Sequence, residues 1–362
     1  MKETKTICFF AGDITRSGGT ERIGTQIMNA LCEDYRTFAV SLTEANNRPF
    51  YTIHPSVKRT ALFDRRPNGK WEYPVIVSRL RRFLRRYQID LLIDMDTVLD
   101  AFSVPAVHGT GVRLIAWEQF HFNADMGTVF RVPFRKLFTR RADLIVTLTQ
   151  EDRARYERAF RGGTRVEQIY NPMIPPETEP VYDTASHTMI SVGRLARQKG
   201  FDYLIQIADI VRKRHPHWQW LILGEGEERE KLEAMLAERC LSQVRLVGKV
   251  DHVGDYLSHA AMFVLTSRFE GFSLALAEAK AHRLPVVSFR CPSGPSELVI
   301  DGVNGYLVEC FDIEQMAESI CKLIENDERR KAFSSRSLMD CEKLDFAGVT
   351  AKWKQIINDL LA

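Results

Sequence analysis

The feature that most constrains the fold is an alternation of short apolar runs with helical patterns, which is interrupted once. Strands are predicted at 6–11, 37–42, 89–94, 113–117 and 143–147. Residues 170–187 then carry four prolines and no periodicity, which is typical of a linker. After it, strands are predicted at 188–193, 219–223, 244–247, 262–265, 285–289 and 305–308, again with helical patterns between them. This order predicts parallel sheets covered by helices on both faces.

The length and the interruption together predict two α/β domains. A chain of 362 residues is too long for one typical core. We expect a first doubly wound, Rossmann-like domain over 1–175, a second over 176–344, and a terminal helix over 345–362. Ligands of such sheets bind beyond the carboxyl ends of the strands, so the cleft between the domains is the expected site.

Composition excludes several classes of protein. The chain is 45% hydrophobic and 27% charged, as in soluble globular proteins, and no apolar run approaches the roughly 18 residues of a membrane span. Its seven cysteines are scattered without a C-x-x-C pair, which argues against a zinc site or a disulfide framework. A reducing cytosol is the expected compartment.

Positive charge is concentrated in the first half of the chain. The segment 78–88 places Arg79, Arg82 and Arg86 on one helical face with Arg81 and Arg85 beside them. The segment 130–141 interleaves five cations with Phe and Leu, which is the composition of an interfacial helix. Each segment alone is also consistent with a solvated helix face. Together they predict contact with an anionic membrane surface, whereas no motif accompanies them that would favour nucleic acid.

Several loops that follow predicted strands carry glycine or cations. Gly18 and Gly19 follow the first strand, but the G-x-G-x-x-G of a dinucleotide site is absent. Arg194 and Lys199 flank a loop of the second half, where a guanidinium fork and an ammonium group can neutralise a diphosphate. Gly224 follows the next strand and permits close approach of a ligand.

Two carboxylates lie in the apolar stretch RFEGFSLALAEAKAHRLPVVS. Ser273 is the expected N-cap of a helix that contains Glu278, and Glu270 lies in the loop before it. The backbone N–H groups near Phe272, Ser273 and Leu274 form an anion site at the positive end of the helix dipole. We therefore interpret Glu278 as an acceptor for ribose hydroxyls and Glu270 as a contact to the sugar or the diphosphate of a nucleotide sugar.

The sequence resembles the retaining group 1 (family 4) glycosyltransferases of the GT-B fold over nearly its whole length. The resemblance rests on SGGTER, SVGRLARQKGFDYLI, LGEGEER, EGFSLALAE and CPSGPSELVIDGVNGYLV. It implies a terminal helix that crosses back to the first domain. It also implies roles for the motif residues. Donor contacts fall on Gly18, Gly19, Gly224, Phe272, Ser273, Leu274 and Glu278, and catalytic roles on Arg194, Lys199 and Glu270.

The resemblance implies transfer of a hexose or N-acetylhexosamine from a nucleotide sugar, with retention and without a metal or other cofactor. A UDP-sugar of the galactose type is weakly indicated by CPSGPSE. The expected acceptor is a lipid-linked saccharide of cell-surface polysaccharide synthesis, at the cytoplasmic face of the inner membrane. The alternatives are a GT-B nucleotide-sugar epimerase, a phosphorylase-like enzyme, or a catalytically silent nucleotide-sugar-binding protein.

Two stretches of the first half leave alternatives open. Asp94 and Asp96 form a D-x-D pattern, which binds a divalent metal in the other major glycosyltransferase fold, but no donor motif lies nearby. Related polysaccharide enzymes show His directly after Glu in a stretch like AWEQFHFN, where this chain has Glu118 followed by Gln119. If the backbone stays extended, His121 points to the same side as Gln119, and we favour His121 as the catalytic histidine.

Overall fold

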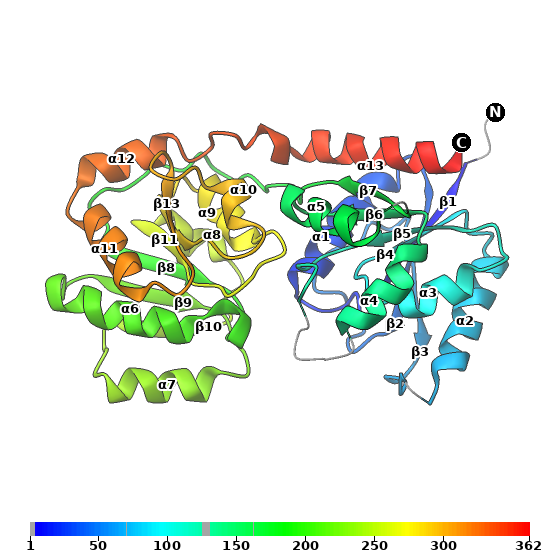
Figure 1. The fold of residues 1–362 in the computed structure, drawn as a ribbon, viewed down its shortest axis with the longest axis horizontal. Coiled ribbons are helices and arrows are strands. Elements are labelled where there is room, and N and C mark those ends of the chain that lie inside the picture. Colours follow the sequence, from blue (N-terminus) through cyan, green and yellow to red (C-terminus); the bar gives the residue numbers. More distant parts are fainter. Residues whose placement is uncertain (1–3, 70, 125–130, 162) are drawn as a thin grey trace. The chain divides into compact units, whose positions relative to one another are not determined.

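The computed structural model describes residues 4–69, 71–124, 131–161 and 163–362 (Figure 1). The chain divides into two compact units, which are described separately. Unit 1 comprises Met1–Pro172 and Phe346–Ala362, and unit 2 comprises Met173–Asp345. Among the described residues, no helix is both long and apolar enough to cross a membrane.

Unit 1 is built on a seven-stranded parallel sheet with the order β3-β2-β1-β4-β5-β6-β7. Its strands are β1 (Thr6–Ala11), β2 (Arg36–Thr43), β3 (Lys58–Phe63), β4 (Leu91–Asp94), β5 (Arg113–Trp117), β6 (Leu144–Thr147) and β7 (Arg165–Gln168). Its helices are α1 (Gly19–Leu31), α2 (Tyr73–Arg86), α3 (Asp100–Val107), α4 (Arg131–Phe138), α5 (Gln150–Ala159) and α13 (Phe346–Leu361), with a 3-10 turn at Thr139–Arg141. The strand order reverses between β1 and β4, which is the switch point where such sheets bind ligands.

Unit 2 contains a six-stranded parallel sheet with the order β10-β9-β8-β11-β12-β13. Its strands are β8 (Thr188–Val192), β9 (Gln219–Leu223), β10 (Val244–Gly248), β11 (Met262–Leu265), β12 (Val286–Phe289) and β13 (Gly305–Val308). Its helices are α6 (Phe201–Arg214), α7 (Arg229–Glu238), α8 (Val253–Ser258), α9 (Leu274–Ala281), α10 (Pro295–Leu298), α11 (Ile313–Ile324) and α12 (Asp327–Ser335), with 3-10 turns at Arg197–Lys199 and Glu342–Leu344. Here the order reverses between β8 and β11.

The apolar pattern of the sequence accounts for both cores. All residues of β1, β4, β6, β11 and β12 are buried, as expected for parallel strands covered on both faces. Helix α2 buries Ile76, Leu80, Phe83 and Leu84, which recur at helical spacing. The predicted α/β class with two doubly wound sheets is confirmed. The sequence prediction missed β3, β7 and α3.

The terminal helix α13 packs on unit 1. The Trp353 ring meets Trp117 of β5 edge to face, with centroids 4.7 Å apart, and both residues are buried. The Tyr35 hydroxyl donates to Asn358 Oδ1 at 2.9 Å. The last 17 residues are thus part of the first unit's fold, although the whole of unit 2 separates them from it in the sequence.

The second half of the proline-rich segment 170–187 is fixed to unit 2. The Tyr182 hydroxyl donates to the carbonyl of Ala261 at 2.7 Å. Arg330, which is buried, donates to the carbonyl of Thr184 at 3.1 Å. This segment has neither helix nor strand, yet its polar groups find partners in the domain that it enters.

Candidate active site

The predicted donor residues of unit 2 lie in loops at the carboxyl ends of its parallel strands. Arg194 and Lys199 follow β8, Gly224 follows β9, and Glu270 follows β11. Because β8 and β11 are hydrogen-bonded neighbours at the switch point, their loops begin side by side. Two distant parts of the sequence are thereby brought to the place where an open α/β sheet binds ligands.

Lys199 and Glu270 form an ion pair at this switch point. The Lys199 Nζ lies 2.8 Å from Oε1 and 3.1 Å from Oε2 of Glu270. The Ser267 hydroxyl also donates to Glu270 Oε1. The side chains are 17% and 4% exposed, so both charges are largely withdrawn from water. The structure thus joins two residues that the sequence analysis placed in the same site for separate reasons.

Gly224 permits close packing of the β9 loop on the β8 loop. Its φ is +140°, and a Cβ at this position would lie 2.0 Å from the carbonyl oxygen of Gly193. A Cβ on Gly226 would similarly lie 2.4 Å from the carbonyl oxygen of Leu195. The sequence analysis assigned this close approach to a ligand, whereas the observed neighbour is protein backbone. The two glycines shape the loop that carries Arg194.

Arg194 differs from Lys199 in its freedom to move. Its side chain is 60% exposed, and its ion-pair partner Glu227, 3.7 Å away, is 63% exposed. Exposed pairs of this kind contribute little to stability. The guanidinium can therefore leave Glu227 for a stronger anion at little energetic cost.

Helix α9 begins at Leu274 as predicted, but Ser273 does not cap it with its hydroxyl. Ser273 has φ 68° and ψ 75°, in the left-handed region, and its Oγ has no hydrogen-bond partner. A side-chain cap normally requires extended backbone, so this correction follows from the turn geometry. The first N–H groups of α9 have no partner within the helix, as at any helix start. Glu278 is half-buried one turn further along.

The loop after β12 supports the Glu270 loop, and the sequence analysis assigned it no contact. The Glu270 N–H donates to the carbonyl of Pro292 at 3.2 Å. Gly294 has φ +86°, and a Cβ there would lie 2.9 Å from the carbonyl oxygen of Phe272. The Pro-Ser-Gly sequence was the available signal, since it marks a turn with special backbone angles.

In unit 1, the two glycines after β1 lead into helix α1. Gly18 is the residue before the helix and Gly19 is its first residue. The Glu21 carboxylate folds back over Gly18, where a Cβ would lie 2.2 Å from Oε2. Burial raises the pKa of Glu21, although the backbone hydrogen bond it accepts favours the charged form. The carboxylate thus lies against the start of its own helix, a partner that the sequence analysis did not identify.

The D-x-D aspartates of unit 1 face different surroundings. Asp94 is fully buried and accepts a hydrogen bond from the Ser103 hydroxyl at 2.7 Å. Burial raises its pKa to about 7. Asp96 Oδ1 instead accepts from the backbone N–H of Val98 at 3.1 Å. Among the described residues there is no group of three His, Cys, Asp or Glu side chains suited to a metal ion.

The segment after β5 is not extended as far as His121. Strand β5 ends at Trp117, and Glu118 turns into the core, where it pairs with Arg135 at 2.9 Å. The condition for Gln119 and His121 to share one side is therefore not met. Both side chains are buried, and His121 Nε2 lies 4.0 Å from Asp152 Oδ1. Burial, with a smaller contribution from a nearby arginine, lowers the pKa of His121 to about 4, so its imidazole is neutral at pH 7.

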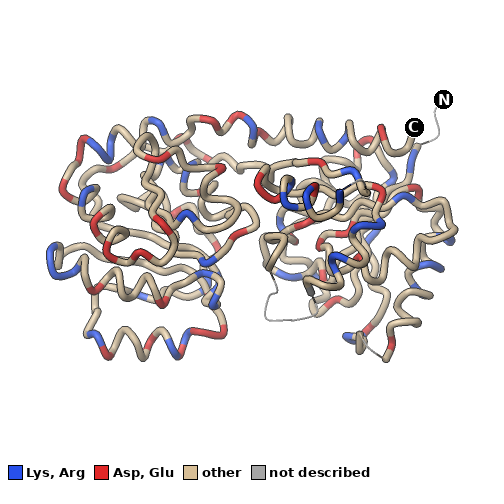
Figure 2. The backbone as a smooth tube through the Cα atoms, viewed as in Figure 1, with Lys and Arg blue, Asp and Glu red and all other residues tan. Residues whose placement is uncertain are grey.

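Figure 2 marks where the Lys and Arg residues lie along the backbone, and the burial of the individual residues shows that the cations of α2 differ in exposure. On α2, Arg82, Arg85 and Arg86 are exposed. Arg81 instead donates to the carbonyls of Pro105 and His108, each at 2.7 Å, at the end of α3. Arg81 was expected to belong to the membrane patch, but its guanidinium is engaged by carbonyls that the end of α3 leaves free.

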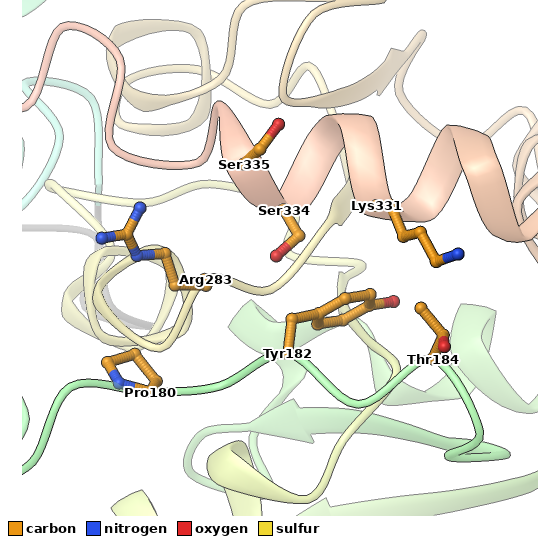
Figure 3. A pocket seen from close by; sticks show the side chains of 7 residues that line it. All are labelled: Pro180, Tyr182, Thr184, Arg283, Lys331, Ser334 and Ser335. Carbon is orange, nitrogen blue, oxygen red and sulfur yellow. The ribbon is translucent and has the colours of Figure 1, made fainter.

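One surface pocket of unit 2 lies apart from these residues (Figure 3). Its volume is about 370 Å³, and helix α12 forms one wall with Lys331, Ser334 and Ser335. The other lining residues are Pro180, Tyr182, Thr184 and Arg283. None of the predicted donor residues lines it.

A family model and individual relatives both relate the chain to glycosyltransferases. The model of the family "Glycosyl transferases group 1" matches residues 179–338. An uncharacterized glycosyltransferase of Haemophilus influenzae is 30% identical over 355 residues, which are 98% of this chain and 100% of that protein. The Campylobacter jejuni GalNAc-alpha-(1->4)-GalNAc-alpha-(1->3)-diNAcBac-PP-undecaprenol alpha-1,4-N-acetyl-D-galactosaminyltransferase is 24% identical and covers 95% of this chain and 96% of its own.

A crystal structure has the same fold. A substituted form of S. aureus TarM, in complex with Fondaparinux, alpha-GlcNAc-glycerol and UDP, superimposes with a TM-score of 0.82. It covers 98% of this chain and 100% of its own, at 16% identity. The similarity extends over both units.

Proposed function

The chain belongs to the group 1 glycosyltransferases and has their GT-B fold, and on this premise we propose a donor, an acceptor and a mechanism for it. The donor is a nucleotide sugar, a UDP-sugar in our proposal, that carries a hexose or N-acetylhexosamine. The acceptor is a lipid-linked saccharide of cell-surface polysaccharide synthesis. The observation that carries the donor assignment is the Lys199–Glu270 pair at the switch point of unit 2.

The diphosphate is the part of the donor that meets positive charge. Lys199, Arg194 and the start of α9 offer an ammonium group, a guanidinium group and backbone N–H donors. Negative charge on the diphosphate grows as its bond to the sugar breaks, so these groups stabilise the transition state more than the bound donor. The same cations make a divalent metal unnecessary, and we propose transfer without one.

Glu270 orients the sugar and Glu278 orients the ribose. Ionised carboxylates accept hydrogen bonds from hydroxyl groups, and Glu270 is held in place by Lys199 and Ser267. The retained configuration requires the acceptor hydroxyl to attack from the face that the diphosphate leaves. Unit 1 binds the acceptor in this proposal, with Gln119 and His121 as the candidate contacts.

UDP binding tests the donor assignment. Glu278→Ala is expected to weaken UDP binding by roughly 1–3 kcal/mol, the usual loss when a charged hydrogen-bond partner is removed. Isothermal titration calorimetry with UDP measures this difference. Glu314→Ala is the control, because Glu314 lies exposed on α11 and is expected to leave the affinity unchanged. Equal affinity of the wild type and Glu278→Ala would remove Glu278 from the nucleotide site.

We further propose that unit 1 contacts anionic lipid at the cytoplasmic face of the inner membrane. Helix α4 exposes Phe134 by 44% and Leu137 by 46%. Helix α3 contacts both α4 and α2, and α2 exposes Arg82, Arg85 and Arg86. Apolar side chains and cations thus occur in one helical layer, which suits an interfacial site.

Liposome sedimentation tests the membrane contact. The triple charge reversal Arg82→Glu, Arg85→Glu and Arg86→Glu is expected to weaken binding to anionic liposomes by at least about 3 kcal/mol, at ~1 kcal/mol for each cation lost. Neutral liposomes serve as the control. Equal sedimentation of variant and wild type with anionic liposomes would show that α2 is an ordinary solvated helix.

A further inference from the structure

Helix α4 buries an arginine and exposes a phenylalanine and a leucine, the reverse of an ordinary amphipathic helix. Arg135 is 1% exposed, whereas Phe134 and Leu137 on the same helix are 44% and 46% exposed. Burying a charged group costs several kcal/mol unless a counter-charge and hydrogen bonds compensate for the lost water. The contacts of Arg135 therefore indicate what the helix gains from burying it.

The counter-charge is Glu118, the first residue after β5. Arg135 Nε lies 2.9 Å from Glu118 Oε2, and both side chains are 0% exposed. The Thr97 hydroxyl bridges the pair, since it accepts from Arg135 Nε and donates to Glu118 Oε2, each at 3.0 Å. Tyr156 of α5 also donates to Glu118 Oε2. The pair thus joins the loops after β4 and β5 to α4 and α5.

The rest of the guanidinium is directed to backbone carbonyls. Arg135 Nη1 donates to the carbonyls of His121, at 3.2 Å, and Phe122, and Nη2 donates to that of Ala124 at 3.4 Å. Five N–H donors in a rigid plane can serve a carboxylate and three carbonyls together, whereas the single ammonium group of lysine cannot. The arginine therefore holds three carbonyls within four residues of one loop.

Two further hydrogen bonds fix the same loop. The Phe122 N–H donates to Asp152 Oδ1 at 3.1 Å, and the Ala124 N–H donates to the His121 carbonyl at 2.8 Å. Burial raises the pKa of Asp152 to about 7, so its carboxyl is partly neutral at physiological pH. Glu118 is the carboxylate that pairs directly with Arg135.

We propose that Arg135 is a positioning residue that, through Glu118 and the carbonyls of residues 121–124, fixes the loop carrying Gln119 and His121. The proposal rests on the proposed function, in which this loop contacts the acceptor. Arg135 itself is too deeply buried to touch a substrate, so it acts only through the loop. Glu118 serves in this proposal as the counter-charge of Arg135.

Hydrogen exchange and transfer kinetics with Arg135→Lys test this inference. We expect the Phe122 and Ala124 amides to exchange at least tenfold faster, while amides of β1 and β4 change by less than threefold. At a temperature where the variant is fully folded, kcat should fall at least tenfold and the affinity for UDP should stay constant. If Arg135→Lys does not fold, Thr97→Val replaces it, with the same local pattern of exchange expected at smaller amplitude.

The control is Leu84→Ala, which removes a buried side chain of α2 outside this network and is expected to cost about 2–5 kcal/mol. It should raise exchange throughout unit 1 without changing kcat of the folded enzyme. A uniform increase in amide exchange across unit 1 of the Arg135→Lys variant would overturn the inference. Faster exchange confined to the Phe122 and Ala124 amides with an unchanged kcat would overturn it as well. A wild type without transfer activity refutes the proposed function instead, while the exchange data still decide whether Arg135 holds the loop.

Discussion

Removing both members of the Lys199–Glu270 pair should destabilise unit 2 by less than the sum of the two single removals. Unit charges 2.8 Å apart attract by about 6 kcal/mol at an effective dielectric constant of about 20, and desolvation offsets much of this. Breaking a buried pair on one side costs about 3–5 kcal/mol, because the remaining charge has no partner. Since the Lys199 side chain is still 17% exposed, we expect about 3 kcal/mol for Lys199→Met.

The double variant Lys199→Met with Glu270→Gln contains no unpaired charge. It should be more stable than the sum of the single effects predicts, by about 2 kcal/mol. Urea denaturation of the four proteins measures this coupling. Arg194→Met is the control, and its exposed, loosely paired side chain should change stability by less than about 0.5 kcal/mol.

Activity should behave differently from stability in the same variants. The double variant should lose less stability than the sum of the single losses but regain none of the transfer activity, because the charge proposed to meet the diphosphate is still missing. Additive losses of stability would show that the two charges do not depend on each other. Restored turnover in the double variant would refute the role of Lys199 in stabilising the leaving group.

Two further substitutions test the geometry of the sites. Gly224→Ala should lower both stability and UDP affinity, because a Cβ there meets the Gly193 carbonyl. Gly302→Ala is the control for backbone strain alone, since Gly302 has φ +72° and no atom lies within 4 Å of its Cβ position. Thermal denaturation measures the stability of both variants and calorimetry measures their UDP affinity. Asp94→Asn should stabilise unit 1 at pH 8 by up to about 4 kcal/mol. The folded pKa of about 7 lies above the ordinary aspartate pKa of 3.8 expected in the unfolded chain, so the stability contributed by the protonated carboxyl is present below pH 3.8 and is lost as pH rises through 7. Thermal denaturation at pH 4 and pH 8 measures the gain, and a gain that is equal at both would contradict the buried, protonated state of Asp94.

The sequence predicts the buried strands well because their residues are apolar on both faces. It misses β3 and β7, the edge strands of the first sheet, which are short, half-exposed and rich in charge. Helix α3 escapes detection because Pro105 interrupts its pattern. These elements are stabilised by their neighbours in the fold, and their own residues give little periodic signal.

The candidate site is predictable as a set of residues but not as a set of contacts. Lys199 and Glu270 each follow a strand, which marks them in the sequence, but their contact depends on the pairing of β8 with β11. Arg135 shows the opposite case. Its segment reads as a basic surface helix, and only the position of Glu118 explains why that one cation is buried. Long-range pairing of charges has no local signature.

The proposed function is transfer of sugar from a UDP-sugar to a lipid-linked acceptor with the help of Lys199. The most direct measurement is the incubation of the purified protein with radiolabelled UDP-sugars and a bacterial membrane extract in EDTA, followed by organic extraction. Label is expected in the lipid fraction from one UDP-sugar, with the α-configuration of the donor retained. The Lys199→Met variant is expected to transfer at least a hundredfold less label. Absence of labelled lipid with every UDP-sugar, or equal labelling by Lys199→Met, would contradict the proposed function.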